Sequence, residues 1–187
     1  MFGSHKRQGR EAGVAVRNSF ASVSMNTSLF EFGRGFVPTR EFLTDPYVLG
    51  FIIGSLNLMR AFLFKGQKWA QIKTGQYLIE ALEQIRGNVP DFDLSKMTEQ
   101  MLPNRYNPDF ELGQKHAELN FGAMFGLIKQ SSDEPVVLEA RRIAGGLQKA
   151  GDWIGEPSGD PDMGFKMAIS QLTLKEQLEN RFPEKAA

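Results

Sequence analysis

The stretch Pro46–Phe64, PYVLGFIIGSLNLMRAFLF, decides the fold class of this chain. Its apolar residues cover most of the circumference of a helix, and the preceding Thr44-Asp45 supplies a capping side chain. A membrane-spanning helix needs about 20 mostly apolar residues, so the stretch is nearly long enough to cross a membrane. Asn57 and Arg60 lie inside it, however, and a buried Arg is costly in a bilayer. The pattern therefore favours a helix buried at the centre of a bundle over a membrane span.

Further helical segments surround this central stretch. Its small residues Gly50, Gly54 and Ser55 permit close approach of a neighbouring helix. Apolar residues at spacings of three, four and seven predict helices over 68–86, 95–102, 107–130, 135–151 and from about 163 to 181. We expect Pro103 to stop the second of these, and the capping-box pattern Thr173–Glu176 predicts a kink or restart in the last. The sequence thus predicts an all-α fold, a helical bundle of about five to six helices.

The N-terminal region is expected to differ from the bundle. Residues 1–41 are basic, contain Gly, Ser and Phe, and include three glycines that weaken a helix, at positions 3, 9 and 13. We therefore expect a flexible or extended arm over 1–41 and a helical domain over 42–187. The first residues lack the continuous apolar core of a secretory signal, which favours a cytoplasmic protein; an organelle matrix is the alternative if the basic leader is a transit peptide.

Several chemistries are excluded by composition. The chain has no cysteine, so disulfides, thiolate metal sites and cysteine nucleophiles are absent, and only His5 and His116 are available as histidine ligands. On a helix His116 and Glu118 diverge by about 200° and cannot share a ligand, so a solvated or half-buried histidine is expected. No phosphate-binding glycine loop or nucleophile elbow occurs. No cofactor, metal site or catalytic residue is predicted, and a non-enzymatic role is favoured over an enzyme.

Charge is unevenly distributed along the chain. Residues 1–90 carry eleven Lys and Arg against six acidic residues, whereas residues 91–187 carry eleven against sixteen, for a net charge of zero. This asymmetry is compatible with a basic face for an acidic partner, or with packing of two oppositely charged halves. Nucleic-acid binding is not favoured, because no Lys/Arg cluster lies on one helix.

An aromatic cluster in a basic, glycine-containing segment is the most unusual feature. Phe30, Phe32 and Phe36 alternate with Arg34, and Arg40 follows. Such a segment is typical of a recognition strip, so these five residues are the predicted partner-binding site. The alternative is a hydrophobic strap that covers the open end of the bundle, with Phe42 as a further member.

These features lead to one expected function and its alternatives. The Phe- and Met-rich helices favour a non-enzymatic protein–protein interaction or oligomerisation module, as a homo-oligomer or a subunit with a protein partner. The first alternative is a helical pocket for an apolar small molecule such as a lipid, quinone or tetrapyrrole. The second is peripheral membrane association through residues 46–64.

Overall fold

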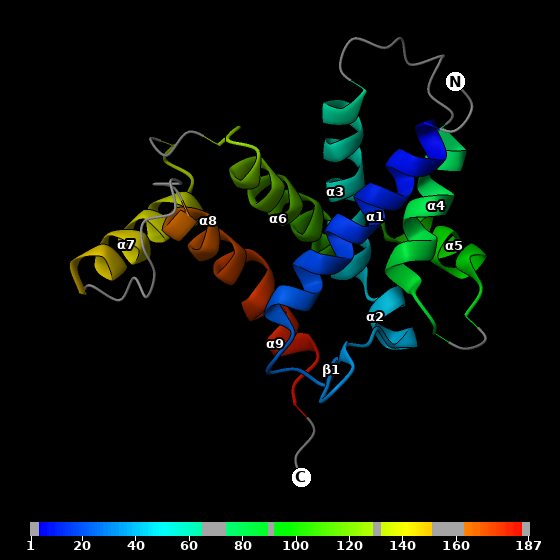
Figure 1. The fold of residues 1–187 in the computed structure, drawn as a ribbon, viewed down its shortest axis with the longest axis horizontal. Coiled ribbons are helices and arrows are strands. Elements are labelled where there is room, and N and C mark those ends of the chain that lie inside the picture. Colours follow the sequence, from blue (N-terminus) through cyan, green and yellow to red (C-terminus); the bar gives the residue numbers. More distant parts are fainter. Residues whose placement is uncertain (1–3, 65–73, 90–91, 129–131, 151–162, 185–187) are drawn as a thin grey trace.

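A computed structural model describes residues 4–64, 74–89, 92–128, 132–150 and 163–184, and it is predominantly helical (Figure 1). The all-α class is therefore confirmed. The elements in chain order are α1 (Ser4–Val23), β1 (Phe30–Glu31), β2 (Gly35–Phe36), α2 (Arg40–Thr44), α3 (Pro46–Leu63), α4 (Thr74–Arg86), α5 (Leu94–Asn104), α6 (Pro108–Met124), α7 (Pro135–Ala150), α8 (Met163–Ser170), the π-helical turn η2 (Gln171–Lys175) and α9 (Glu176–Arg181). The expected five to six helices were too few, because α1 lies within the region expected to be an arm, α2 begins at its end, and the last helix is interrupted.

Helix α3 is the central helix that its sequence predicts. It begins at Pro46, and the Asp45 carboxylate accepts a hydrogen bond from the backbone N–H of Val48 at 3.0 Å. Among the described residues α3 is the one helix long and apolar enough to cross a membrane by length and composition, yet 56% of that window is buried inside the protein. The core helix of a bundle meets the same criterion, so the apolar sequence does not by itself require a membrane.

Helices α3 and α6 pack so closely that their backbones touch. A Cβ atom on Gly50 would lie 2.0 Å from the carbonyl oxygen of Phe110, and one on Gly113 would lie 2.1 Å from that of Tyr47. Any side chain at these positions would push the helices apart. The close approach expected from the small residues of α3 is therefore present, and glycines on both helices make it.

Residues 4–23 form a helix, which corrects the expectation of a flexible or extended arm there. Ala12, Val16 and Phe20 of α1 are fully buried. Gly9 and Gly13 face α4, where a Cβ on either would lie 2.4 Å from a backbone oxygen, of Tyr77 and Ala81 respectively. The low helix propensity of glycine disfavours a helix, but the absence of a Cβ at these two positions permits the close contact with α4 that stabilises α1.

The segment between α1 and α2 carries a small antiparallel hairpin. Phe30 pairs with Phe36, and two glycines have positive φ values, Gly33 in the turn at 83° and Gly35 at the start of β2 at 74°. The backbone N–H of Ser28 donates to the carbonyl of Phe182 at 2.9 Å, so the hairpin also contacts the C-terminal segment. The division into units 1–41 and 42–187 stays a prediction.

Other helix boundaries differ in part from those expected. Pro103 lies inside α5 and does not stop it. Helix α6 ends at Met124, earlier than residue 130, because Gly126 adopts a left-handed conformation at φ 68° and turns the chain. Near Thr173 the last helix passes through the π-helical turn η2, but the expected capping box does not form, because the Thr173 hydroxyl donates to the carbonyl of Ile169 at 2.7 Å. The expected start of the second helix at residue 68 lies outside the described residues.

Candidate functional site

The five predicted partner-binding residues lie in two different environments. Phe36 is buried, and Phe30 is half-buried in β1. Phe32 is fully exposed at the hairpin turn, Arg34 is exposed and pairs with Glu31 at 3.1 Å, and Arg40 is exposed at the start of α2. The hairpin therefore presents Phe32 and Arg34 to solvent, while Phe36 belongs to the core; their role in binding stays a prediction.

The buried members of the aromatic cluster pack against the helices, as expected for a hydrophobic strap over the end of the bundle. The Phe36 ring lies edge-on to Phe42, with 5.3 Å between centroids, and it stacks on Phe20 of α1 at 6.1 Å. Phe42 in turn contacts Phe182 near the C-terminus at 5.7 Å. These aromatic contacts hold the hairpin and α2 against α1 and the C-terminal segment.

A groove between α1, α6 and α8 is the candidate site that sequence reasoning missed. It encloses about 570 Å³ and is mostly apolar. Met124, Met163 and Met167 line it while remaining 51%, 42% and 62% exposed. The lining residues are Ala15, Asn18, Ser19, Ser22, Asn120, Met124, Met163, Lys166, Met167 and Ser170. We call this the α1–α6–α8 groove.

The groove has a fixed polar group beneath its methionines. Asn120 is buried, and its side-chain amide donates to the Ser170 hydroxyl at 3.1 Å and to the Thr173 hydroxyl at 3.4 Å. These bonds tie α6 to α8 and η2. The methionine side chains are unbranched and flexible, so the groove combines a fixed base with an adaptable apolar wall.

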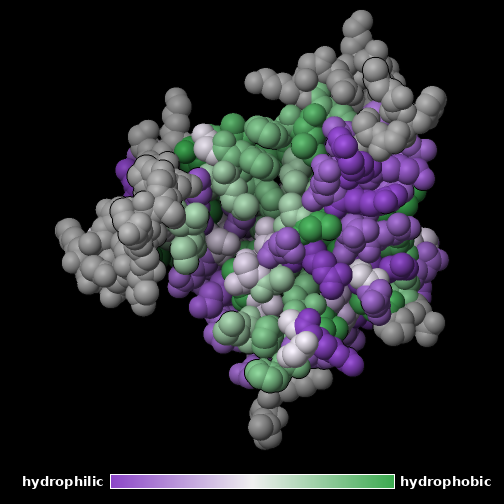
Figure 2. Space-filling model, viewed as in Figure 1, coloured by the Kyte–Doolittle hydropathy of each residue, from purple (hydrophilic) through white to green (hydrophobic). Residues whose placement is uncertain are grey.

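Apolar surface continues beside the groove. Figure 2 shows hydrophobic surface over α3 and the adjoining part of α6, bordered by the hydrophilic surface of α1. Phe62 at the end of α3 is half-exposed and stacks on Phe125, with 4.7 Å between ring centroids, and Leu127 is also exposed. Contiguous exposed apolar surface of this kind marks interaction sites more often than scattered exposed residues do.

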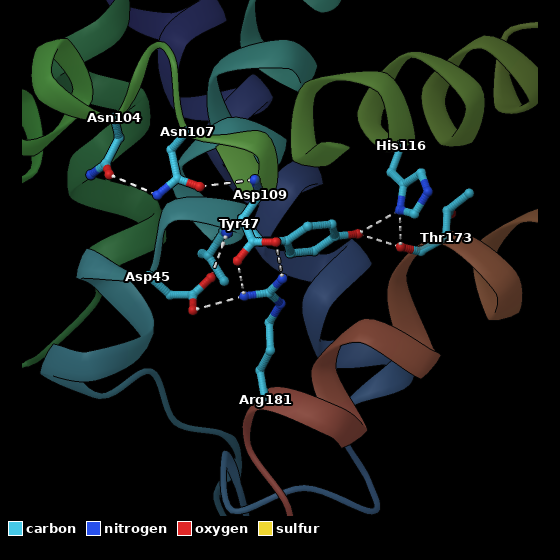
Figure 3. A network of polar contacts seen from close by, with 9 residues as sticks. Asp45, Tyr47, Asn104, Asn107, Asp109, His116, Thr173 and Arg181 are labelled. Atoms are coloured by element: carbon cyan, nitrogen blue, oxygen red, sulfur yellow. Dashed lines mark hydrogen bonds and ion pairs between the residues drawn. The ribbon is translucent and has the colours of Figure 1, made fainter. Parts of the chain in front are cut away.

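A polar network joins the ends of α3, α6 and α9 (Figure 3). The Arg181 guanidinium lies 3.3 Å from Asp45, which caps α3, and 3.0 Å from Asp109 in the first turn of α6. It also lies over the Tyr47 ring, 4.9 Å from the centroid. The two carboxylates lie at the N-terminal, positive ends of the helix dipoles of α3 and α6, where negative charge is stabilising, and Arg181 joins the two carboxylates. We call this the Arg181 clamp.

The Tyr47 hydroxyl and the His116 ring meet at the carbonyl of Thr173 (Figure 3). His116 Nδ1 lies 3.0 Å from that oxygen and 3.1 Å from the Tyr47 hydroxyl, which donates to the same carbonyl. Burial raises the pKa of Tyr47 above its ordinary value, although the Arg181 cation opposes this. Burial also lowers the pKa of His116, against the opposing effect of its bond to Thr173.

This arrangement favours a neutral His116 and a protonated Tyr47 at neutral pH. His116 is buried, which corrects the expectation of a solvated or half-buried ring. The Tyr47 hydroxyl and the His116 ring both contact the backbone carbonyl of Thr173 in η2. These contacts hold η2 against α3 and α6. Within the described ranges, no group of three His, Asp or Glu side chains is placed to hold a metal ion.

Comparisons with protein-family models, curated proteins and solved structures found no match for this chain.

Proposed function

We propose that this chain is a non-enzymatic helical interaction protein that self-associates through the α1–α6–α8 groove. The observation that carries the proposal is the presence of Met124, Met163 and Met167, all substantially exposed, along one groove. Methionine-rich surfaces adapt to an apolar partner surface and gain favourable contacts as they are buried. A folded chain would gain little from exposing these side chains to water.

A second copy of the chain is the partner that the charge favours. The formal net charge is zero, so two copies approach without net electrostatic repulsion. A two-fold axis would place the same patch on both sides of the interface, and flexible methionines suit such self-complementary packing. The apolar surface around Phe62 and Phe125 would extend the contact beyond the groove.

The test measures the mass of the protein in solution by light scattering and native mass spectrometry. The wild type is expected at twice 21.0 kDa. Met167→Lys adds a charge to the groove and is expected to give a monomer with an unchanged far-UV circular dichroism spectrum. Met25→Lys is the matched control, because Met25 is 70% exposed and does not line the groove, and it should remain a dimer. A monomeric wild type, or a dimer in Met167→Lys, would refute self-association through the groove.

A second candidate is a carrier of an apolar or amphipathic small molecule in the same groove. Its volume of about 570 Å³ falls in the range of about 300–1,000 Å³ typical of small-molecule sites. Its polar base at Asn120 could orient one polar group of such a ligand. A monomer that carries extra mass in the native spectrum and loses it on denaturation would favour this candidate over the dimer.

A further inference from the structure

A second pocket, separate from the α1–α6–α8 groove, lies where the hairpin meets α1 and the end of α4. It encloses about 310 Å³ and is lined by Arg17, Arg34, Phe36, Val37, Pro38, Asn88 and Val89. Three segments far apart in the sequence contribute, and two of the residues are in the predicted recognition strip. We call it the hairpin pocket. The seven described residues that line it are part cationic or polar and part apolar, and none of these seven is acidic.

Arg17 is a fixed cation in this pocket. Its Nη1 donates to the backbone carbonyl of Gln84 at 3.1 Å, and its guanidinium lies 6.0 Å from the centroid of the Phe36 ring. It packs against Gly87, where a Cβ would lie 2.2 Å from Nη1 and where φ is 58°. Among the described residues Arg17 forms no ion pair, so its charge is available to a bound anion.

Arg34 is a second cation, already paired within its own hairpin. Its Nη1 lies 3.1 Å from a carboxylate oxygen of Glu31. The pocket therefore presents two guanidinium groups with one positive charge left uncompensated. That balance matches a single negative charge, as on a carboxylate, better than the double charge of a phosphate. The apolar side, formed by Phe36, Val37 and Val89, suits an apolar group beside the anion.

We propose that the hairpin pocket binds an acidic segment of a partner protein, with one carboxylate between Arg17 and Arg34 and a neighbouring apolar side chain against Phe36. Planar guanidinium groups recognise carboxylates through paired, charge-assisted hydrogen bonds. This binding does not depend on self-association through the groove.

The test is fluorescence anisotropy of a short labelled peptide of alternating Glu, Leu and Ser, titrated with the full chain. A peptide with Gln in place of Glu is the comparison. Arg34→Gln is expected to weaken binding of the Glu peptide about ten- to a hundredfold, the usual loss of a charge-assisted hydrogen bond. Glu31→Gln is expected to tighten binding several-fold, because it removes the internal competitor for Arg34.

Arg142→Gln on α7 is the matched control. The Arg142 side chain is 74% exposed and pairs with Glu139 three residues away, whereas Arg34 is 77% exposed and pairs with Glu31 three residues away. Arg142→Gln should leave the affinity unchanged. Equal weakening by both substitutions, or equal binding of the Gln peptide, would show non-specific charge attraction and overturn the proposal. Displacement of the peptide by inorganic phosphate where acetate has no effect would overturn the assignment to a carboxylate.

Discussion

Gly50→Ala is expected to destabilise the protein strongly, although alanine is the better helix former. The added Cβ would lie 2.0 Å from the carbonyl oxygen of Phe110, and such atoms essentially never approach within 3.0 Å. The helices α3 and α6 must therefore separate by on the order of 1 Å at this point. Overpacking of this kind typically costs about 1–3 kcal/mol, occasionally more. The obstacle is backbone, which cannot rotate aside as a side chain can, so the upper part of that range applies.

The net effect combines this cost with the gain in helix propensity. Ala stabilises a helix interior over Gly by about 1 kcal/mol, so we expect a net loss of about 1–2 kcal/mol in the free energy of unfolding. For a urea dependence of about 2 kcal/mol per molar, the unfolding midpoint would fall by about 0.5–1 M. Urea titration followed by circular dichroism at the helical minimum measures this shift.

Gly145→Ala in α7 is the control, because a Cβ there would meet no heavy atom within 4 Å. It should stabilise the protein by about 0.5–1 kcal/mol, the propensity gain alone. The same substitution is thus expected to have opposite signs at two helical positions. An unchanged unfolding midpoint in Gly50→Ala would show that the backbones of α3 and α6 are not in direct contact at this position.

Two further predictions concern the polar network. Arg181→Gln removes the cation that joins the Asp45 and Asp109 carboxylates, and it should lower the free energy of unfolding by about 2 kcal/mol in thermal or urea denaturation. Lys175→Gln is the control, because the Lys175 ion pair is 3.9 Å long. A loss in Arg181→Gln no greater than that in Lys175→Gln would contradict the Arg181 clamp. His116 should make the protein less stable as the pH falls. Burial lowers the pKa of His116 in the folded state below the unfolded value of about 6.5, so the unfolded state takes up a proton first. The stability present above about pH 6.5 is therefore lost as the pH falls toward the folded pKa. The slope of stability against pH in that window should be smaller in His116→Gln, and an unchanged slope would count against the burial of the ring.

The sequence predicted those elements whose signals are local. The Asp45-Pro46 and Asn107-Pro108 pairs mark the starts of α3 and α6, and both helices begin where expected. Each signal acts within one turn, through a side-chain cap and a proline that needs no N–H.

Prediction failed where a local preference was opposed by packing. Gly9 and Gly13 indicated a flexible arm, yet both lie in α1 at its contact with α4. Helix propensities describe a residue in an isolated, water-exposed helix. They contain no information about a second helix that packs against that residue in the folded protein.

The sequence alone determined the all-α class, the central apolar helix and most of the helix starts, because apolar periodicity and capping residues act over a few neighbouring positions. Only the tertiary structure decided the candidate surfaces. The Arg181 clamp joins residues 136 positions apart, Ser19 and Met167 both line the α1–α6–α8 groove, and Arg17 and Arg34 both line the hairpin pocket. Such contacts depend on how whole helices cross. The crossing is set by close packing at glycines such as Gly50 and Gly13, and the sequence around a glycine does not show which helix packs there.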